Sequence, residues 1–392
     1  MLKRFVMRRY RRFAPLLDLA GAVYGDAVLL YDALDRRNEA VKDDVARELG
    51  RVLGARNVFE LWSCEKAFEA EFAAWCGKRR AIGMPSCTAA LQLALVASGV
   101  GPGDEVITSA HTFVATALAI LNTGARPVLV DPDPASLGMT ADAVARALSP
   151  RVKAVVPVHM HGHPVDMPPL LALAEKHGLA VVEDCAQAAG AWGGARRVPL
   201  GPTGCFSFFP TKPLGGAGNG GMVVTDDEAM AERIERARDP EGHDPIVLAG
   251  KRTPGYLNAM EIAVLRAKLP RLDDWTARRE AIARGYIEAL AGLDVVAPAQ
   301  GTRSAWSSVV VRVDERDRVK RDMLAAGVET RVEYSPPFFE STTFTEMGWN
   351  AADYPVAVDA ARRGLSLPVH PFLTEAEQTQ VLAALRKALG RG

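Results

Sequence analysis

Short β-rich runs alternate with longer helical patterns between about Ala81 and Asp184, and this alternation constrains the fold more than any other feature of the chain. It is typical of βαβ units, which build a mainly parallel sheet with helices on both faces. The predicted strands are Arg80–Met84, Glu105–Ser109, Pro127–Asp131, Ala154–His159 and Ala180–Asp184, with helices Thr88–Ser98, Phe113–Leu121 and Met167–His177 between them. The almost continuously apolar run Ala154–Val158 indicates strands that are buried on both faces. The sequence therefore predicts an α/β fold.

The C-terminal part of the chain predicts a second, smaller unit. Strands Cys205–Phe209 and Gly221–Thr225 precede a long helical stretch near Ala259–Leu290 with a break at Pro270, and then strand Ser308–Val313, helix Arg316–Ala326, strand Thr330–Tyr334 and a closing helix Thr374–Leu389. A chain of 392 residues exceeds the roughly 250–300 at which a single core stops growing. We therefore expect an N-terminal helical extension over 1–60, a large domain over 61–270 and a small α+β domain over 271–392.

Charge and cysteine usage narrow the class of function. The 47 basic and 47 acidic residues balance, so the chain as a whole has no electrostatic attraction for nucleic acid. Five cysteines without a CxxC pair or a zinc spacing favour a reduced, cytoplasmic protein without a metal site. Residues 1–17 predict a basic amphipathic helix, which we expect to pack against the fold or an oligomer partner rather than to bind a membrane surface. No segment is long and apolar enough to span a bilayer.

Two polar segments lie at the ends of predicted strands. In the turn Pro85–Thr88, backbone N–H groups and hydroxyls at a helix start could hold a phosphate, although Ser86 or Thr88 could equally serve as a simple helix cap. The segment Glu183–Gln187 ends a buried strand at the edge where open α/β sheets bind ligands. A carboxylate such as Asp184 needs a partner there, and a protonated pyridine nitrogen is one; helix capping is the alternative.

Two further segments carry a candidate nucleophile and a candidate stacking ring. Lys212 follows an aromatic strand and leads into a glycine-rich turn, which suits an amine whose pKa is lowered by burial, but a surface lysine in a loop has the same composition. Ser207, five residues earlier, has a hydroxyl that could bind the same phosphate. Phe113 follows another strand and could stack on a planar cofactor or simply belong to the core.

These segments occur in the order and approximate spacing of the DegT/StrS family of pyridoxal-phosphate (PLP) sugar aminotransferases, which the chain resembles from about Phe68 to Leu389. The resemblance extends to Gly101–Thr108, Pro157–Met167 and Leu367–Pro371. It implies fold type I of the aspartate aminotransferases, with a mainly parallel seven-stranded type of sheet, and a homodimer with active sites at the subunit interface.

The resemblance also implies roles for individual residues. Lys212 would be the Schiff-base lysine and, once displaced, the proton shuttle, while Asp184 would be the partner of the pyridine nitrogen. Gln187 would bind the phenolic oxygen and Phe113 would stack on the ring. The phosphate would be held by Ser207 and by the turn that contains Ser86, Cys87 and Thr88.

The chain departs from the family pattern at several positions. Cys87 replaces the middle glycine of Ser-Gly-Thr, and Asn219 replaces an acid before the double glycine. Pro254 and Tyr256 stand where many relatives carry Asn-x-Arg, a motif that reaches the neighbouring subunit's site. Arg252, Tyr256 or Asn258 could rebuild these contacts, or they could be missing, and we count Asn258 among the expected cofactor-binding residues. Glu333 stands where a histidine is usual.

The expected reaction is a two-half transamination in which glutamate or glutamine donates the amino group and a keto sugar, expected to be nucleotide-linked, accepts it. Two alternatives remain open. One is a PLP enzyme that acts on a carbocyclic or aminocyclitol precursor or dehydrates a sugar, although lysine at position 212 disfavours the dehydratases that carry histidine there. The other is a non-catalytic regulatory protein that retains the fold, because a fold does not fix a function.

Overall fold

The computed structural model describes residues 29–239 and 255–391. The basic helix expected within residues 1–17, as well as Arg252 and Pro254, lies outside the described residues.

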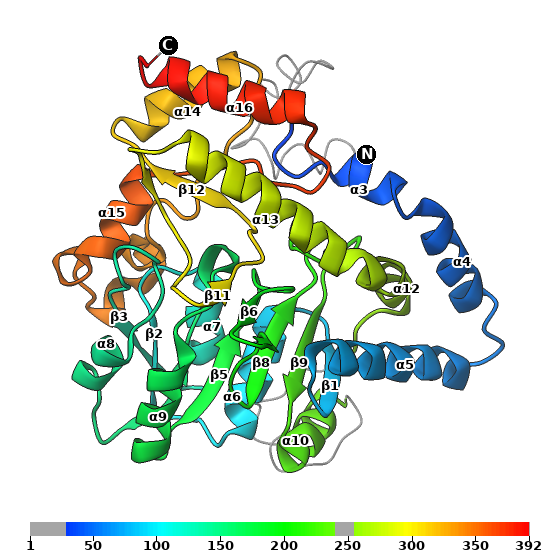
Figure 1. Ribbon diagram of the computed structural model, residues 1–392. Coiled ribbons are helices and arrows are strands. Elements are labelled where there is room, and N and C mark those ends of the chain that lie inside the picture. The colour runs from blue at the N-terminus through cyan, green and yellow to red at the C-terminus, as the bar shows by residue number, and fades with distance from the viewer. Residues whose placement is uncertain (1–28, 240–254, 392) are drawn as a thin grey trace, which may run out of the picture.

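A seven-stranded sheet in the order β1-β9-β8-β5-β4-β2-β3 forms the centre of the molecule (Figure 1). Its strands are β1 (Arg80–Met84), β2 (Glu105–Ser109), β3 (Arg126–Val130), β4 (Val152–Val156), β5 (Ala180–Asp184), β8 (Thr203–Ser207) and β9 (Gly221–Thr225). The strands from β8 to β3 pair in parallel, whereas β9 is antiparallel to both of its neighbours, β1 and β8. The expected α/β architecture with a mainly parallel sheet is confirmed.

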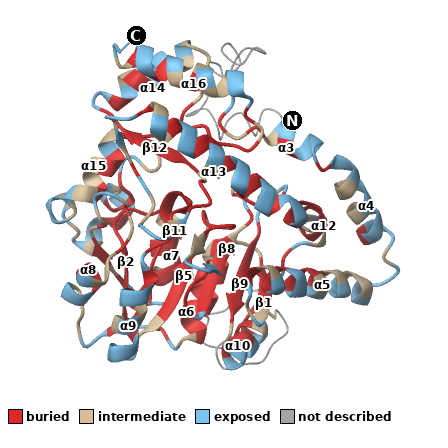
Figure 2. Cartoon of the chain, viewed as in Figure 1, coloured by how far each residue is buried: buried red, intermediate tan, exposed pale blue. Residues whose placement is uncertain are grey.

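Helices cover both faces of this sheet. On one face lie α6 (Cys87–Ala97), α7 (Val114–Leu121) and α10 (Glu228–Arg238), and on the other lie α5 (Val58–Cys76), α8 (Ala141–Arg146), α9 (Met167–His177) and α12 (Ala259–Lys268). Successive side chains of a strand point to opposite faces of the sheet. Val155 therefore belongs to the core beneath α5, α8, α9 and α12, whereas its neighbours Ala154 and Val156 belong to the core beneath α6, α7 and α10. Figure 2 accordingly shows the central strands as buried and the outer helix faces as exposed.

The strand boundaries follow the prediction closely, with differences that backbone chemistry explains. Strands β1, β2, β5 and β9 begin and end where the sequence predicts. Strand β4 ends at Val156 rather than at His159, because Pro157 has no N–H group to continue the ladder. Strand β8 ends at Ser207 rather than at Phe209, because the chain then turns through Pro210. The long helix breaks as expected at Pro270, where the 3-10 turn η2 (Leu269–Arg271) separates α12 from α13 (Leu272–Ala289).

A smaller antiparallel sheet is formed by β10 (Asp294–Val295), β12 (Val309–Arg312) and β13 (Gly364–Leu367). Helices α14 (Arg316–Ala325), α15 (Pro355–Arg363) and α16 (Glu375–Ala388) pack around it, and the short turns η3 (Phe338–Glu340), η4 (Thr342–Met347) and η5 (Ala351–Asp353) precede α15. The remaining short pieces are β6 (Trp192–Gly193), β7 (Arg196–Arg197), β11 (Thr302–Arg303) and η1 (Met160–Gly162).

The strand predicted over Thr330–Tyr334 is wrong. Only Arg331 pairs, in a single bridge to Ser366 in β13, and the chain then leaves the sheet. Two prolines, Pro336 and Pro337, follow and cannot donate to a ladder. Residues 331–334 instead line a cavity beside the larger sheet. Strand β13, which is only four residues long, was also not predicted from the sequence.

The start of the described chain connects the two sheets. Leu29 belongs to the core of the smaller sheet, and its backbone bonds to Gly327 and Glu329. Helix α3 (Leu34–Glu39) follows, and α4 (Lys42–Leu53) then packs against α12 on the larger unit. Across the described ranges, no helix has the length and apolar character needed to cross a membrane.

Candidate active site

A cavity of about 400 Å³ opens at the carboxyl-terminal edge of the parallel strands. Its walls come from the ends of β5 and β8, the starts of α6 and α7, the loop after β8, and residues 331–334 beside the smaller sheet. Open α/β sheets bind ligands at this edge, and the volume lies within the range of small-molecule sites.

Asp184 provides a buried carboxylate at the end of β5 and is only 5% exposed. Its Oδ2 accepts a hydrogen bond of 2.8 Å from the Thr116 hydroxyl, and its Oδ1 accepts one of 3.1 Å from the backbone N–H of Ala186. Burial raises the pKa of Asp184, while these hydrogen bonds and the charge of Lys212 oppose the rise. A protonated pyridine nitrogen would supply the cation that a buried carboxylate requires, so this wall fits PLP.

The start of α6 forms a cradle suited to phosphate. The Ser86 side chain accepts from the backbone N–H of Ala89, and the first N–H groups of the helix, at Cys87 and Thr88, face the cavity edge without intrahelical acceptors. Ser207 lies opposite Gly221 across the β8–β9 pair. A Cβ atom on Gly221 would lie 2.5 Å from the Ser86 carbonyl carbon, so this close approach requires glycine.

The thiol of Cys87 points away from this cradle. It donates to the carbonyl of Cys205 over 3.6 Å, and burial raises the pKa of the thiol well above its usual value. The side chain is therefore neutral, and the contribution available from Cys87 is its backbone N–H.

Lys212 stands in a tight turn directly after β8. Its backbone N–H donates to Phe209 over 2.9 Å, and Gly216 closes the loop by donating to Phe208 over 2.7 Å. From the other side, the buried Arg37 of α3 donates to the carbonyl of Lys212 over 3.0 Å and also to that of Pro210. The loop is thus held from both sides while the half-buried Lys212 side chain lines the cavity.

The wall opposite the cradle is a hydrogen-bonded group of side chains. The Gln187 Oε1 accepts from the backbone N–H of His161 over 2.5 Å, and its Nε2 donates to the Tyr334 hydroxyl over 3.1 Å. The Glu333 carboxylate lies 3.4 Å from Gln187 Nε2 and 3.5 Å from His161 Nδ1. Burial would raise the pKa of Glu333, but the hydrogen bond and charge of His161, together with Lys212, hold it below its ordinary value. Glu333 is therefore an ionised group in the cavity wall.

The rim of the cavity is aromatic. Phe113 occupies the position just before α7 and is 50% exposed, so it does not belong to the core. Its ring centroid lies 5.1 Å from that of Tyr334, and Phe209 on the other side of the cavity is also exposed. Exposed rings beside a cavity leave flat faces available to a planar ligand.

Buried groups behind the cavity fix the end of β5. His159 Nδ1 accepts from the backbone N–H of Val165, so Nε2 carries the proton and donates to Glu183 over 2.7 Å. The same carboxylate accepts from the backbone N–H groups of Leu200 and Gly201. Although His159, Glu183 and Cys185 lie close enough to suggest a metal ion, the ring nitrogens of His159 are both engaged in this framework. The cluster supports the position of the neighbouring Asp184.

The structure brings together nearly all of the site residues named from sequence. Those that line the cavity are Ser86, Cys87, Thr88, Phe113, Asp184, Gln187, Ser207 and Lys212. Asn258 does not line it; its side chain caps α12 by accepting from the backbone N–H of Met260 over 2.8 Å. Sequence reasoning missed Thr116, Arg331 and Tyr334, which also line the cavity. The spacing of Thr112 and Thr116, one helical turn apart, is the one signal that could have pointed to Thr116.

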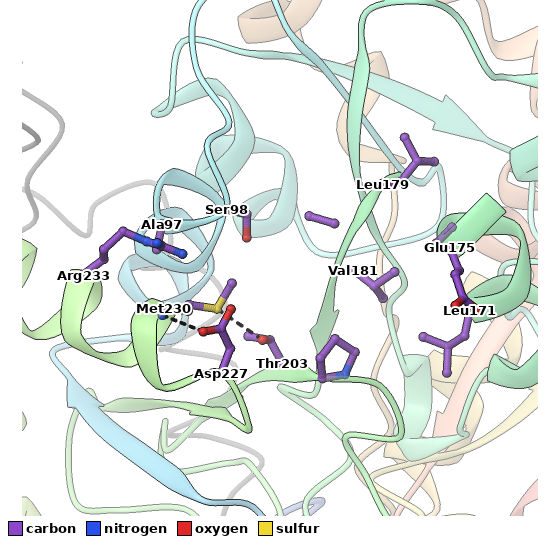
Figure 3. A pocket seen from close by; sticks show the side chains of 13 residues that line it. Ala97, Ser98, Leu171, Glu175, Leu179, Val181, Thr203, Asp227, Met230 and Arg233 are labelled. Carbon is purple, nitrogen blue, oxygen red and sulfur yellow. Dashed lines mark hydrogen bonds between the residues drawn. The ribbon is translucent and has the colours of Figure 1, made fainter. Parts of the chain in front are cut away.

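A second hollow of about 530 Å³ lies at the opposite, amino-terminal edge of the sheet (Figure 3). Its wall includes Ser98 at the end of α6, Leu179 just before β5, Thr203 at the start of β8 and Arg233 in α10. Asp227, also in this wall, is engaged as the cap of α10. None of the site residues named from sequence lies there, so the first cavity is the candidate active site.

Known proteins resemble the chain along most of its length. The DegT/DnrJ/EryC1/StrS aminotransferase family matches residues 41–386. The dTDP-3-amino-3,4,6-trideoxy-alpha-D-glucose transaminase of Streptomyces venezuelae is 40% identical over 326 residues, which is 82% of this chain and 86% of that protein. The erythromycin biosynthesis sensory transduction protein EryC1 of Saccharopolyspora erythraea is 40% identical over 351 residues, 88% of this chain and 95% of that protein.

Solved structures agree with these relatives. The crystal structure of S. venezuelae DesV superposes with a TM-score of 0.87 at 37% identity, covering 92% of this chain and 98% of that one. The expected PLP cofactor and aminotransferase class are confirmed. The chain belongs to the DegT/DnrJ/EryC1/StrS aminotransferase family.

Proposed function

We propose that this aminotransferase transfers an amino group from glutamate or glutamine to the carbonyl of a nucleotide-linked keto sugar. The observation that carries the proposal is the convergence of Lys212, Asp184 and the phosphate cradle of α6 on one cavity at the sheet edge. The S. venezuelae relative is named as a transaminase of a dTDP-linked amino sugar, which supports the substrate class.

In this proposal, several residues of the chain bind the cofactor, and Lys212 also transfers a proton. When bound, PLP supplies an electron sink for deprotonation of the carbon that carries the amino group. The N–H groups at Cys87 and Thr88, with Ser207, hold its phosphate, and Asp184 holds the ring nitrogen in its protonated form. Lys212 Nζ binds the cofactor and, once released, accepts and returns the proton at the reacting carbon. Gln187 orients the phenolic oxygen, and Phe113 covers the ring.

The sugar and donor pocket in this proposal is the wall formed by Arg331, Glu333 and Tyr334. The Glu333 carboxylate is an acceptor suited to sugar hydroxyls, whereas Arg331 is a cation suited to the donor's carboxylate or a nucleotide phosphate. Arg331 is already oriented by Asp32 and by the Tyr31 ring, whose centroid lies 4.7 Å from the guanidinium carbon.

We also propose a homodimer with shared active sites. Tyr256 and Asn258 lie away from this chain's own cavity, and Tyr256 is 38% exposed. On the dimer proposal, these residues reach the partner's cavity from the segment that precedes α12. The cytoplasmic location stays a prediction from the unpaired cysteines, all five of which are free thiols.

Absorbance spectroscopy of the purified holoenzyme tests the proposed function. We expect a yellow protein whose visible band is lost in Lys212→Ala, and a shift of that band when glutamate or glutamine is added. A keto sugar linked to dTDP or UDP should then restore the original spectrum. A band that responds to neither donor would contradict amino transfer, while a donor response without restoration by any nucleotide-linked keto sugar would redirect the acceptor to a carbocycle.

A regulatory role is the second candidate, because the EryC1 relative is named a sensory transduction protein. The same spectra distinguish the regulatory function from the enzymatic one. A protein that binds PLP but whose spectrum stays unchanged with both amino donors fits the regulatory role and not the enzymatic one.

A further inference from the structure

A small, partly open void borders the loop that carries Lys212 and shares Thr211 with the lining of the neighbouring cofactor cavity. Its volume is about 20 Å³, and its walls come from the segment around α3, from α13, from the loop before α16 and from the Lys212 loop itself. A void of this size accommodates a single water molecule or a monatomic ion of similar radius.

Three buried basic side chains donate to backbone carbonyls of the Lys212 loop, and two of them, Arg37 and Arg279, line the void. Arg37 is 4% exposed and donates to the carbonyls of Lys212 and Pro210. Arg279, which is 6% exposed, donates to Pro213 over 3.4 Å. Lys268 is 1% exposed and donates to Gly215 over 2.9 Å. Helices α3 and α13 thus each direct one guanidinium group toward this short loop, while burial and the charge of Arg37 lower the pKa of Lys268 in α12 to about 7.

The charge of Arg37 and Arg279 is only partly balanced within the void. The carboxylate in its wall belongs to Asp32, whose charge raises the pKa of Arg37, but the same carboxylate also forms an ion pair with Arg331. Within the described parts of the chain, Arg37 Nε, Arg279 Nη1 and both ring nitrogens of His370 have no hydrogen-bond partner. Burial lowers the pKa of Arg37 to about 10, and burial together with the charge of Arg37 lowers that of Arg279 to about 9. Two buried guanidinium groups beside a single carboxylate that also pairs with Arg331 are incompletely neutralised, which is costly, so the site favours an anion over a neutral occupant.

We propose that this void binds a monovalent anion of the size of chloride or bromide. Arg37 Nε and Arg279 Nη1 donate to it, and its charge offsets the two guanidinium groups. By holding Arg37 and Arg279 in place, the anion fixes the carbonyls of Pro210, Lys212 and Pro213 and so the position of the Lys212 backbone. The anion takes no part in a chemical step.

Thermal unfolding of the holoenzyme in matched salts tests the site. At constant ionic strength, we expect chloride or bromide to raise the melting temperature by about 2 °C or more relative to gluconate, which is too large to enter. The difference should vanish in Arg279→Met and persist in Arg284→Met, an exposed arginine of the same helix that pairs with Glu280. Equal melting temperatures of the wild type in all three salts would overturn the proposal.

A crystallographic measurement keeps the test decisive if Arg279→Met fails to fold. Crystals of the wild-type holoenzyme grown in bromide should show an anomalous peak within hydrogen-bond distance of both Arg37 Nε and Arg279 Nη1. Density without anomalous signal at this position would identify water and overturn the anion site. In the same salts, hydrogen exchange of residues 210–216 should be slower with chloride than with gluconate, and unchanged exchange would contradict the link to the Lys212 loop.

Discussion

At the scale of single residues, Asp184 carries the clearest chemical consequence. Its carboxylate is buried at a strand end with only neutral hydrogen-bond donors, the hydroxyl of Thr116 and the N–H of Ala186, and with the more distant charge of Lys212. This arrangement leaves the carboxylate without a directly bound cation until PLP binds with its pyridine nitrogen protonated. The position therefore matters for cofactor chemistry more than for the stability of the protein alone.

Asp184→Asn is expected to lower kcat by at least about a hundredfold, because the amide cannot hold a protonated ring nitrogen by charge. Thr116→Val removes one hydrogen bond to the same carboxylate and should cost about tenfold. Steady-state kinetics and the visible spectrum of each variant provide the measurement. A fully active Asp184→Asn enzyme would show that this carboxylate does not contact the ring.

Glu333 offers a second prediction at this scale, and it rests on the proposed sugar pocket. Glu333→Gln keeps the size of the side chain but removes the negative charge, so KM for the keto sugar should rise about tenfold through weakened hydrogen bonds to its hydroxyls. PLP affinity should change little. Separate KM values for the sugar and the amino donor make the test, and an increase confined to the amino donor would assign Glu333 to donor binding instead.

At the scale of elements, the ion pair between α3 and α16 can be tested by changing one side chain. Glu377 completes the capping box of α16 with Thr374 and also pairs with Arg36 of α3 over 2.6 Å. The bond from Arg36 and the contacts to Thr374 lower the pKa of Glu377 to about 2, from an ordinary value of 4.5. Since the folded pKa is depressed, this stabilisation is complete above about pH 4.5 and is lost as the pH falls toward 2.

Glu377→Gln should therefore lower the free energy of unfolding by about 1–2 kcal/mol at pH 7, and its difference from wild type should shrink below pH 4.5. Glu375→Gln, an exposed change in the same first turn, should cost less than about 0.5 kcal/mol. Denaturant unfolding of the three proteins at pH 7 and pH 3 provides the comparison. A Glu377→Gln deficit that is as large at pH 3 as at pH 7 would contradict the ionic origin.

The central elements could be predicted from sequence because their signals are local. Strands such as Glu105–Ser109 are short β-rich runs between turns, and the ends of parallel strands meet at one edge, which brings Asp184 and Ser207 together. The segment Thr330–Tyr334 has the composition of a strand, yet tertiary contacts direct it into the cavity wall. No local pattern records that Tyr334 meets Gln187, since 147 positions separate them.

At the scale of the whole molecule, the candidate site is built by parts of the chain that belong to different cores. The large sheet supplies the strand ends and the Lys212 loop, whereas residues 331–334 extend from the smaller sheet. Leu29 packs into the core of the smaller sheet, and Arg37, a short distance along the chain, holds the Lys212 loop. The N-terminal segment thus mechanically links the smaller core to the catalytic loop.

This construction predicts that PLP binding stabilises both parts together. Hydrogen exchange of the holoenzyme should be slower than that of the apoenzyme at residues 86–88, 184–187, 207–212 and 331–334, because ligand binding adds stability only to the assembled cavity. Helix α4, which belongs to neither sheet and lines no part of the cavity, serves as the internal reference. Lys212→Ala with PLP should keep much of this protection, because the phosphate cradle and Asp184 remain. Protection confined to the large sheet, with 331–334 unchanged, would show that the smaller unit does not contact the bound cofactor.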